Sequence, residues 1–320
     1  MNYDNFKEQF CSKVKAALEA EGYAVLEKVV LKTNGRHLDS LIVSPPDSKV
    51  SPTIYVEPYY DGYLAGGTLE EAVNYAVRTI MVHCRTELKI PELNRQTAME
   101  NLYAIVVNAD LNKEMLSECP HRLLAEDLAI VPRFRVDVPD GSGSFLVKHE
   151  MLPRLQMTKD EVINVALNNS KQQQFELKSM SDMLRDMFTG AEEPIPDEML
   201  EEMFPNEDIG MYVLTNTEKV NGAVVLACKD LLSNAMEQIG DCFILPSSLH
   251  EVILVKKSMG HALEELEAMV KEVNRTQVAP EEILSNHVYE INPLTKKLQI
   301  AKGKEIVEKT DLQKRMTLCM

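Results

Sequence analysis

Apolar residues recur every three or four positions in some stretches of this chain and alternate with polar residues in others. Spacing of the first kind predicts amphipathic helices, and alternation predicts strands with one buried face. The longest helical pattern follows Ser258, a candidate N-cap, and continues to about Val273. Further helices are predicted over residues 3–21, 68–84, 158–170 and 230–238. Another predicted helix follows residue 170 and ends near residue 188. Strands are predicted over residues 23–33, 36–44, 53–56, 127–138, 144–148, 211–216, 223–228, 242–246, 251–256 and, as a hairpin, 287–300.

Turn and capping signals separate these elements. Asn34-Gly35 lies between two predicted strands and is typical of a two-residue hairpin turn. Thr68-x-x-Glu71 and Thr158-x-x-Glu161 each have the spacing of a capping box, in which hydroxyl and carboxylate satisfy the first free N–H groups of a helix. Hairpins between helices predict an α+β fold with largely antiparallel sheets, packed with amphipathic helices in two lobes.

Composition divides the chain at one place. Residues 190–210 carry eight acidic residues, three prolines and no basic residue, which is typical of a connector. We therefore predict an N-terminal α+β domain over residues 1–189, an acidic linker over 190–210 and a C-terminal α+β domain over 211–320. An alternative for the linker is a docking segment, because residues 199–204 include Met199, Leu200, Met203 and Phe204 at the spacing of an amphipathic turn.

Charge changes the picture of the partners. The 320 residues have a net charge of −16, which disfavours binding to nucleic acid or anionic membranes. A solvated surface explains this charge, and the alternative is an acidic face that binds a basic protein partner. The sequence has no run of about 18 apolar residues, so we predict no membrane span. The polar N-terminus has no secretory pattern, and the six cysteines are scattered, as in buried thiols. These features predict a cytoplasmic protein.

A cluster of four tyrosines is the first candidate site. Tyr55, Tyr59, Tyr60 and Tyr63 lie within nine residues. A tyrosine joins a large apolar face to a hydroxyl that requires a partner, so such a cluster suits a binding surface. The alternative is that the rings pack the corner between strand and helix against the sheet.

Ser247, His250 and Glu251 form the second candidate, since they are residue types of nucleophilic catalysis. Their spacing argues against it, because neighbouring side chains near a strand point to opposite faces. A turn in which serine hydroxyls cap backbone groups is the competing interpretation.

Signals for cofactors and metals are missing. Gly66-Gly67 fits neither phosphate-binding glycine pattern, and no CxxC or HExxH spacing occurs among the seven histidines and six cysteines. We therefore predict neither a cofactor nor a metal site.

Eight short segments of the chain carry a family resemblance: residues 38–42, 51–55, 59–60, 67–71, 127–130, 244–248, 250–252 and 286–289. Together they resemble a family of bacterial proteins known only as a domain of unknown function, from Gram-positive gut anaerobes. The resemblance runs in order through nearly the whole chain and implies no catalytic residue. Members of this family often look like accessory genes of mobile elements, and the resemblance therefore implies a regulatory or interaction role for this chain.

Two functions follow as hypotheses. The first is a protein-interaction or regulatory module with an acidic surface. The second is a hydrolase with a dispersed active site, in which His250 acts as acid or base with help from Glu251 or Ser247.

Overall fold

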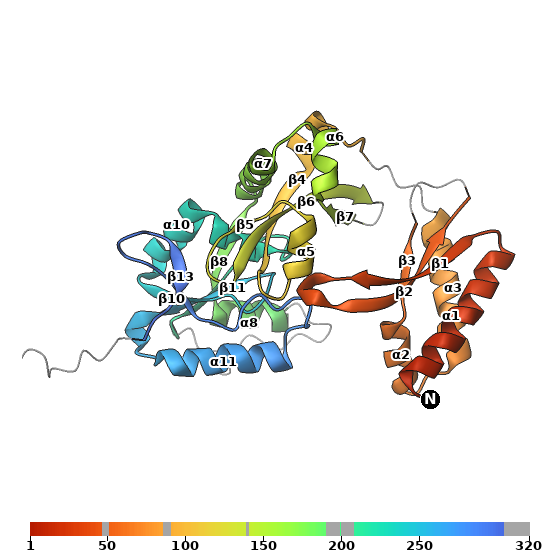
Figure 1. Cartoon of the computed structure of the whole chain (residues 1–320). Coiled ribbons are helices and arrows are strands. Elements are labelled where there is room, and N and C mark those ends of the chain that lie inside the picture. The colour runs from red at the N-terminus through yellow and green to blue at the C-terminus, as the bar shows by residue number, and fades with distance from the viewer. Residues whose placement is uncertain (47–50, 86–90, 139–140, 190–198, 200–207, 304–320) are drawn as a thin grey trace, which may run out of the picture. The chain divides into compact units, whose positions relative to one another are not determined.

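The computed structural model describes residues 1–46, 51–85, 91–138, 141–189, 199 and 208–303, in an α+β fold, as predicted (Figure 1). The chain divides into two compact units. The first contains Met1–Leu123, Leu128–Gln173 and Pro280–Glu282. The second contains Leu124–Asp127, Gln174–Ala279 and Ile283–Met320.

The first unit begins with a helix and an antiparallel sheet. The sheet has the strand order β1-β2-β3, so β1 and β3 are its two edges. The predicted helix, meander and second helix are all present, with a short helix inserted after the third strand. These elements are α1 (Tyr3–Ala20), β1 (Ala24–Leu31), β2 (His37–Ser44), β3 (Thr53–Tyr55), α2 (Glu57–Leu64) and α3 (Leu69–Arg85).

One apolar cluster joins these elements. Phe6 and Phe10 of α1 are fully buried and stack with ring centroids 5.5 Å apart. They pack with Leu41 of β2 and with Ala76 and Ile80 of α3. The helical spacing of the apolar residues in α1 and α3 therefore produces the faces that cover the sheet.

The turn between β1 and β2 is longer than predicted. The Lys32 N–H donates to the Arg36 carbonyl at 2.7 Å, so three residues, Thr33–Gly35, lie between the last hydrogen-bonded pair rather than two. Asn34 and Gly35 have φ values of 60° and 67°, the left-handed conformation that Asn-Gly favours. The dipeptide thus identifies the hairpin correctly, and the turn includes one more residue.

A second sheet of the first unit is built around the long strand β6. Strands β4, β5 and β7 all pair with it in antiparallel register. Helix α7 packs on this sheet through the buried residues Val162, Ile163 and Ala166. The elements are α4 (Arg95–Asn101), β4 (Leu102–Asn108), α5 (Lys113–Glu118), β5 (Arg122–Leu123), β6 (Leu128–Val138), β7 (Gly141–Leu146), α6 (Leu152–Leu155) and α7 (Lys159–Lys171).

The second unit contains an antiparallel sheet of strand order β13-β12-β10-β11-β9-β8. Leu266 and Val270 of α11 pack against Leu245 of β10 and Val255 of β11, so that α11 covers one face. The elements are β8 (Phe175–Ser179), α8 (Met180–Thr189), β9 (Met211–Asn216), α10 (Lys229–Ile239), β10 (Cys242–Leu245), β11 (Val252–Lys256), α11 (Leu263–Thr276), β12 (Tyr289–Ile291) and β13 (Leu298–Ile300).

Two predicted elements of this unit differ from the structure. The apolar run 223–228, predicted as a strand, lies in a 3-10 helix, η3 (Gly222–Ala227), because a short, wholly buried run has no periodicity that separates the two. The helix predicted after Ser258 begins at Leu263. Gly260, with φ of 76°, ends a separate 3-10 turn at Met259 and interrupts the pattern.

The predicted domain boundary stays a prediction. Most of the acidic stretch 190–210 lies outside the described residues. Among those described, β8 precedes this stretch and pairs with β9, which follows it. The structure therefore assigns residues on both sides of the stretch to the second unit.

The capping box of α7 gives a pH prediction. Glu161 accepts the Thr158 backbone N–H at 2.8 Å and forms an ion pair with Arg95 at 2.9 Å. The Thr158 N–H, then Arg95 and the Thr158 hydroxyl, lower the pKa of Glu161 to about 2. A lowered carboxylate pKa means that the ionised form stabilises the fold above the ordinary value of 4.5, and this contribution is lost as the pH falls toward 2.

We expect the Arg95→Ala substitution to raise the Glu161 pKa only part of the way to 4.5, because the Thr158 N–H still donates. An NMR titration of the Glu161 side-chain carboxyl in both proteins measures this difference. An unchanged pKa in the variant would show that the ion pair contributes nothing.

Candidate functional site

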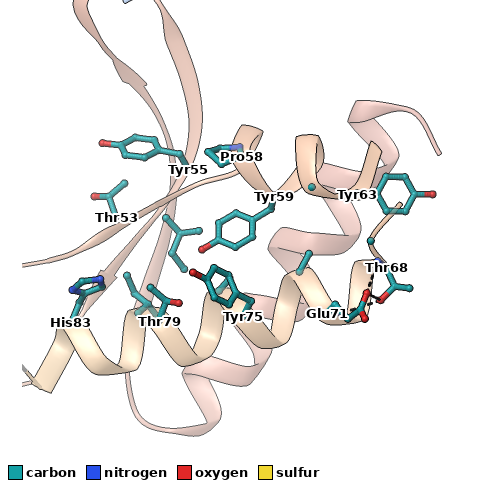
Figure 2. Close-up of a pocket in the computed structure, with 16 residues that line it drawn as sticks. Thr53, Tyr55, Pro58, Tyr59, Tyr63, Thr68, Glu71, Tyr75, Thr79 and His83 are labelled. Atoms are coloured by element: carbon teal, nitrogen blue, oxygen red, sulfur yellow. Dashed lines mark hydrogen bonds between the residues drawn. The ribbon is translucent and has the colours of Figure 1, made fainter. Parts of the chain in front are cut away.

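A groove lies in the first unit between β3 and α2 on one side and α3 on the other (Figure 2). Its volume is about 560 Å³, within the range of ligand-binding sites. We call it the tyrosine groove, because four tyrosines line it: Tyr55, Tyr59, Tyr63 and Tyr75.

The α2 wall rests on the core. Tyr59 packs against the buried ring of Phe10, with centroids 5.0 Å apart, and Tyr63 packs against Phe6 at 5.3 Å. Burial raises the pKa of the Tyr59 hydroxyl. The side chains that face the groove are thus held from behind by the core of this unit.

The α3 wall presents one face of the helix. Glu71, Tyr75, Thr79 and His83 line the groove at intervals of four residues, which places them along one side. The Tyr75 ring lies 6.2 Å from that of Tyr59, and Figure 2 shows the two between the helices. Tyr75 is 63% exposed, so an aromatic surface at the centre of the groove is open to contact.

A glycine turn closes one end of the groove. The Gly67 N–H donates to the Gly62 carbonyl at 3.1 Å, and a Cβ at Gly67 would lie only 3.0 Å from that oxygen. This approach explains why the chain has glycine there. Beside it, Glu71 accepts from the Thr68 hydroxyl and N–H, both at 2.8 Å, and these bonds lower its pKa. The predicted capping box therefore holds an ionised carboxylate at this end.

Strand β3 forms the remaining wall. Thr53, Ile54 and Tyr55 all line the groove. The Lys32 ammonium lies 4.1 Å from the centre of the Tyr55 ring and forms a cation–π contact with it.

The structure does not place all four predicted tyrosines in the groove. Tyr55, Tyr59 and Tyr63 line the groove, whereas Tyr60 does not. Its ring packs against Tyr3 and Phe6, each at 5.2 Å, between α2 and α1. The packing interpretation therefore holds for Tyr60, and binding by Tyr55, Tyr59 and Tyr63 stays a prediction.

Sequence reasoning missed the α3 side of the groove. Tyr75, Thr79 and His83 flank the apolar stripe of a helix that the sequence does predict. Their spacing of four residues beside that stripe was the available signal. The sequence alone does not show which flank of the stripe faces a second element.

The structure places the predicted residues around His250 in the loop between β10 and β11. Ser247 and Ser248 are each 4% exposed, and the Ser248 hydroxyl accepts the His250 N–H at 3.0 Å. The His250 Nδ1 accepts the Asn221 N–H at 3.3 Å. For Ser248, this is the turn-capping role that the sequence suggested. Catalysis by Ser247, His250 and Glu251 stays a prediction.

Other candidates are weaker. In the predicted docking segment 199–204, only Met199 is described, and it is 53% exposed. Cys11, Cys119 and Cys242 form no disulfide, and burial raises the thiol pKa of Cys11 and Cys119 to about 11 and of Cys242 to about 12. These three thiols are therefore protonated near neutral pH and poorly nucleophilic.

Comparison with known proteins gives one match. The model of a family of unknown function, DUF5688, matches residues 3–292. No curated protein and no solved structure matches the chain. Across the described residues, each helix is too short or too polar to cross a membrane.

Proposed function

This chain belongs to the DUF5688 family of unknown function, and we propose that it is a protein-interaction module whose partner binds in the tyrosine groove. The observation that carries the proposal is the exposed Tyr75 ring beside Tyr59, at the centre of an apolar groove. Tyrosine supplies a large contact area at little cost in side-chain entropy and is enriched at protein interfaces.

The chemistry of the groove supports binding over catalysis. Its lining includes Glu71 and His83, which are twelve residues apart on one helix. At 1.5 Å of rise per residue they are separated by about 18 Å, too far for shared proton transfer. The Glu71 carboxylate is moreover engaged by Thr68.

We propose a basic partner in the cytoplasm, and a regulatory outcome of its binding. The net charge of −16 favours a basic partner, and the thiols of Cys11, Cys119 and Cys242 support a reducing compartment. Hydrolysis at His250 remains the alternative, with no observation that favours it over the groove.

The test compares alanine substitutions of two side chains that are equally exposed to solvent. Tyr75 lines the groove, and Leu64 of α2 does not, yet both are 63% exposed. We expect Tyr75→Ala to weaken retention of the partner about tenfold or more in affinity capture from the native host, as for an interface hot spot. Leu64→Ala should retain it like the unsubstituted chain.

Both variants should keep the free energy of unfolding within about 0.5 kcal/mol, because neither side chain is buried. A partner retained equally by Tyr75→Ala and by the unsubstituted chain would remove the groove as its binding site. Loss of the partner at high salt in the unsubstituted chain would support the basic character that we propose.

A further inference from the structure

We propose that the occupant of the tyrosine groove is an extended polypeptide segment that pairs with the free edge of β3 as an added strand. This inference rests on the proposed function and specifies how the partner is recognised. It follows from the hydrogen-bonding register of β3 and from the residues that line the groove.

The register leaves the outer edge of β3 unpaired. Strand β3 is the last in its sheet, and its neighbour is β2. The Val43 N–H donates to the Pro52 carbonyl at 2.9 Å, and the Val56 N–H donates to the Asp39 carbonyl at the same distance. Antiparallel pairs alternate between bonded and non-bonded, so Ile54 is the bonded residue between these two.

The backbone groups of Thr53 and Tyr55 consequently point away from β2. In the part of the chain that the structure describes, neither backbone N–H has a hydrogen-bond partner. An exposed row of such donors and acceptors is a template for another strand. Two N–H and two C=O groups match the repeat of one extended segment.

This edge faces the groove. Thr53, Ile54 and Tyr55 line it in succession, although their side chains alternate between the two faces of the sheet. A cavity that runs along the edge of the strand accounts for three consecutive residues in its lining. A segment in the groove therefore meets the free backbone of β3 on one side and α3 on the other.

The opposite wall specifies the side chains of the segment. In an added strand every second side chain faces the same way, toward Tyr75, Ala76 and Ile80 of α3. These residues favour apolar side chains at alternating positions. The carboxylate of Glu71 at one end favours a basic residue there.

The length of the groove sets the length of the segment. From Glu71 to His83 the α3 wall extends about 18 Å. An extended chain advances about 3.3 Å per residue, so about five residues fill the groove. The expected occupant is a five-residue extended segment with alternating apolar residues and one terminal basic residue.

The probe for a test is a synthetic heptapeptide. It is the sequence most enriched when the whole chain selects from a displayed library of random heptapeptides, with Tyr75→Ala used to remove binders that do not need the groove. Binding is measured by titration calorimetry. If no enriched peptide depends on Tyr75, the groove does not bind extended segments and the inference is overturned.

N-methylation of each peptide bond of the probe in turn tests the strand pairing. An added strand directs alternate N–H groups to β3, so we expect losses of about tenfold at every second position and small effects between them. A block of consecutive sensitive positions would indicate a helical or turn-like ligand. That result overturns the added strand but leaves the groove as a protein-binding site.

A matched pair of variants tests the same bond from the protein side. Thr53→Pro removes the outward N–H, while Thr53→Ala removes only the side chain. Proline is tolerated at a strand edge whose N–H is not paired within the sheet. We expect Thr53→Pro to weaken the probe about tenfold and Thr53→Ala less than about twofold. Equal affinities would overturn the pairing.

Hydrogen exchange in the unsubstituted chain tests the strand pairing without a substitution, so the test does not require any variant to fold. Amide exchange of Thr53 and Tyr55 should slow about tenfold or more when the probe is bound, whereas Ile54, already paired with β2, should change little. Uniform or absent protection across the three amides would contradict the model.

Discussion

Phe10→Ala is expected to lower the free energy of unfolding of the first unit by about 3–5 kcal/mol and to abolish binding in the tyrosine groove. Phe10 is fully buried, stacks on Phe6 and supports the ring of Tyr59. Its truncation removes an aromatic side chain from the core and leaves a cavity directly behind one wall of the groove. The Phe10→Ala substitution should therefore reduce both the stability of the first unit and binding in the tyrosine groove.

Urea unfolding followed by near-ultraviolet circular dichroism measures this loss. The chain has no tryptophan, and eight of its ten tyrosines lie in the first unit, so the tyrosine signal reports mainly on that unit. Tyr75→Ala is the control, since it should lose binding with an unchanged midpoint. A Phe10→Ala protein with unchanged stability would contradict the packing of α1 against α2.

Gly222→Ala is expected to cost about 3 kcal/mol in the second unit, through overpacking rather than loss of contact. An added Cβ at Gly222 would overlap the Thr215 hydroxyl and the His250 carbonyl oxygen, and would lie 2.9 Å from the Asn216 nitrogen. Two of these neighbours are backbone atoms, which do not rotate away. The overlap also breaks the hydrogen bond that Thr215 donates to His250 at 2.6 Å.

The control is the same chemical change at Gly62, where no atom beyond the adjoining backbone of α2 lies within 4 Å of the added Cβ. Because Gly62 lies in α2, Gly62→Ala should raise stability by about 0.5–1 kcal/mol. Urea midpoints by far-ultraviolet circular dichroism, with amide exchange in β9 and β11, measure both effects. A fully stable Gly222→Ala protein would show that η3 moves away from β9 without cost.

The sequence by itself determined the elements that local physics controls. Helix α1 follows from apolar residues at helical spacing, and the caps of α3 and α7 follow from a hydroxyl three residues before a carboxylate. The hairpin of β1 and β2 follows from Asn34-Gly35, and the α+β class follows from alternating strands joined by such turns.

Only the tertiary structure decided the site, because a groove needs two walls and each wall is ambiguous alone. The four clustered tyrosines look equivalent in sequence, yet Tyr60 turns toward α1 while Tyr59 meets Tyr75 across the groove. Tyr75 lies twelve residues beyond Tyr63, outside the cluster.

The free edge of β3 is likewise invisible in the sequence. Strand order depends on which neighbours pair over long distances, and only the pairing with β2 shows that Thr53 and Tyr55 direct their backbone groups outward. The run 223–228 makes the same point for the second unit. Local pattern cannot distinguish a buried strand from a buried 3-10 helix, and packing against β9 decides the outcome.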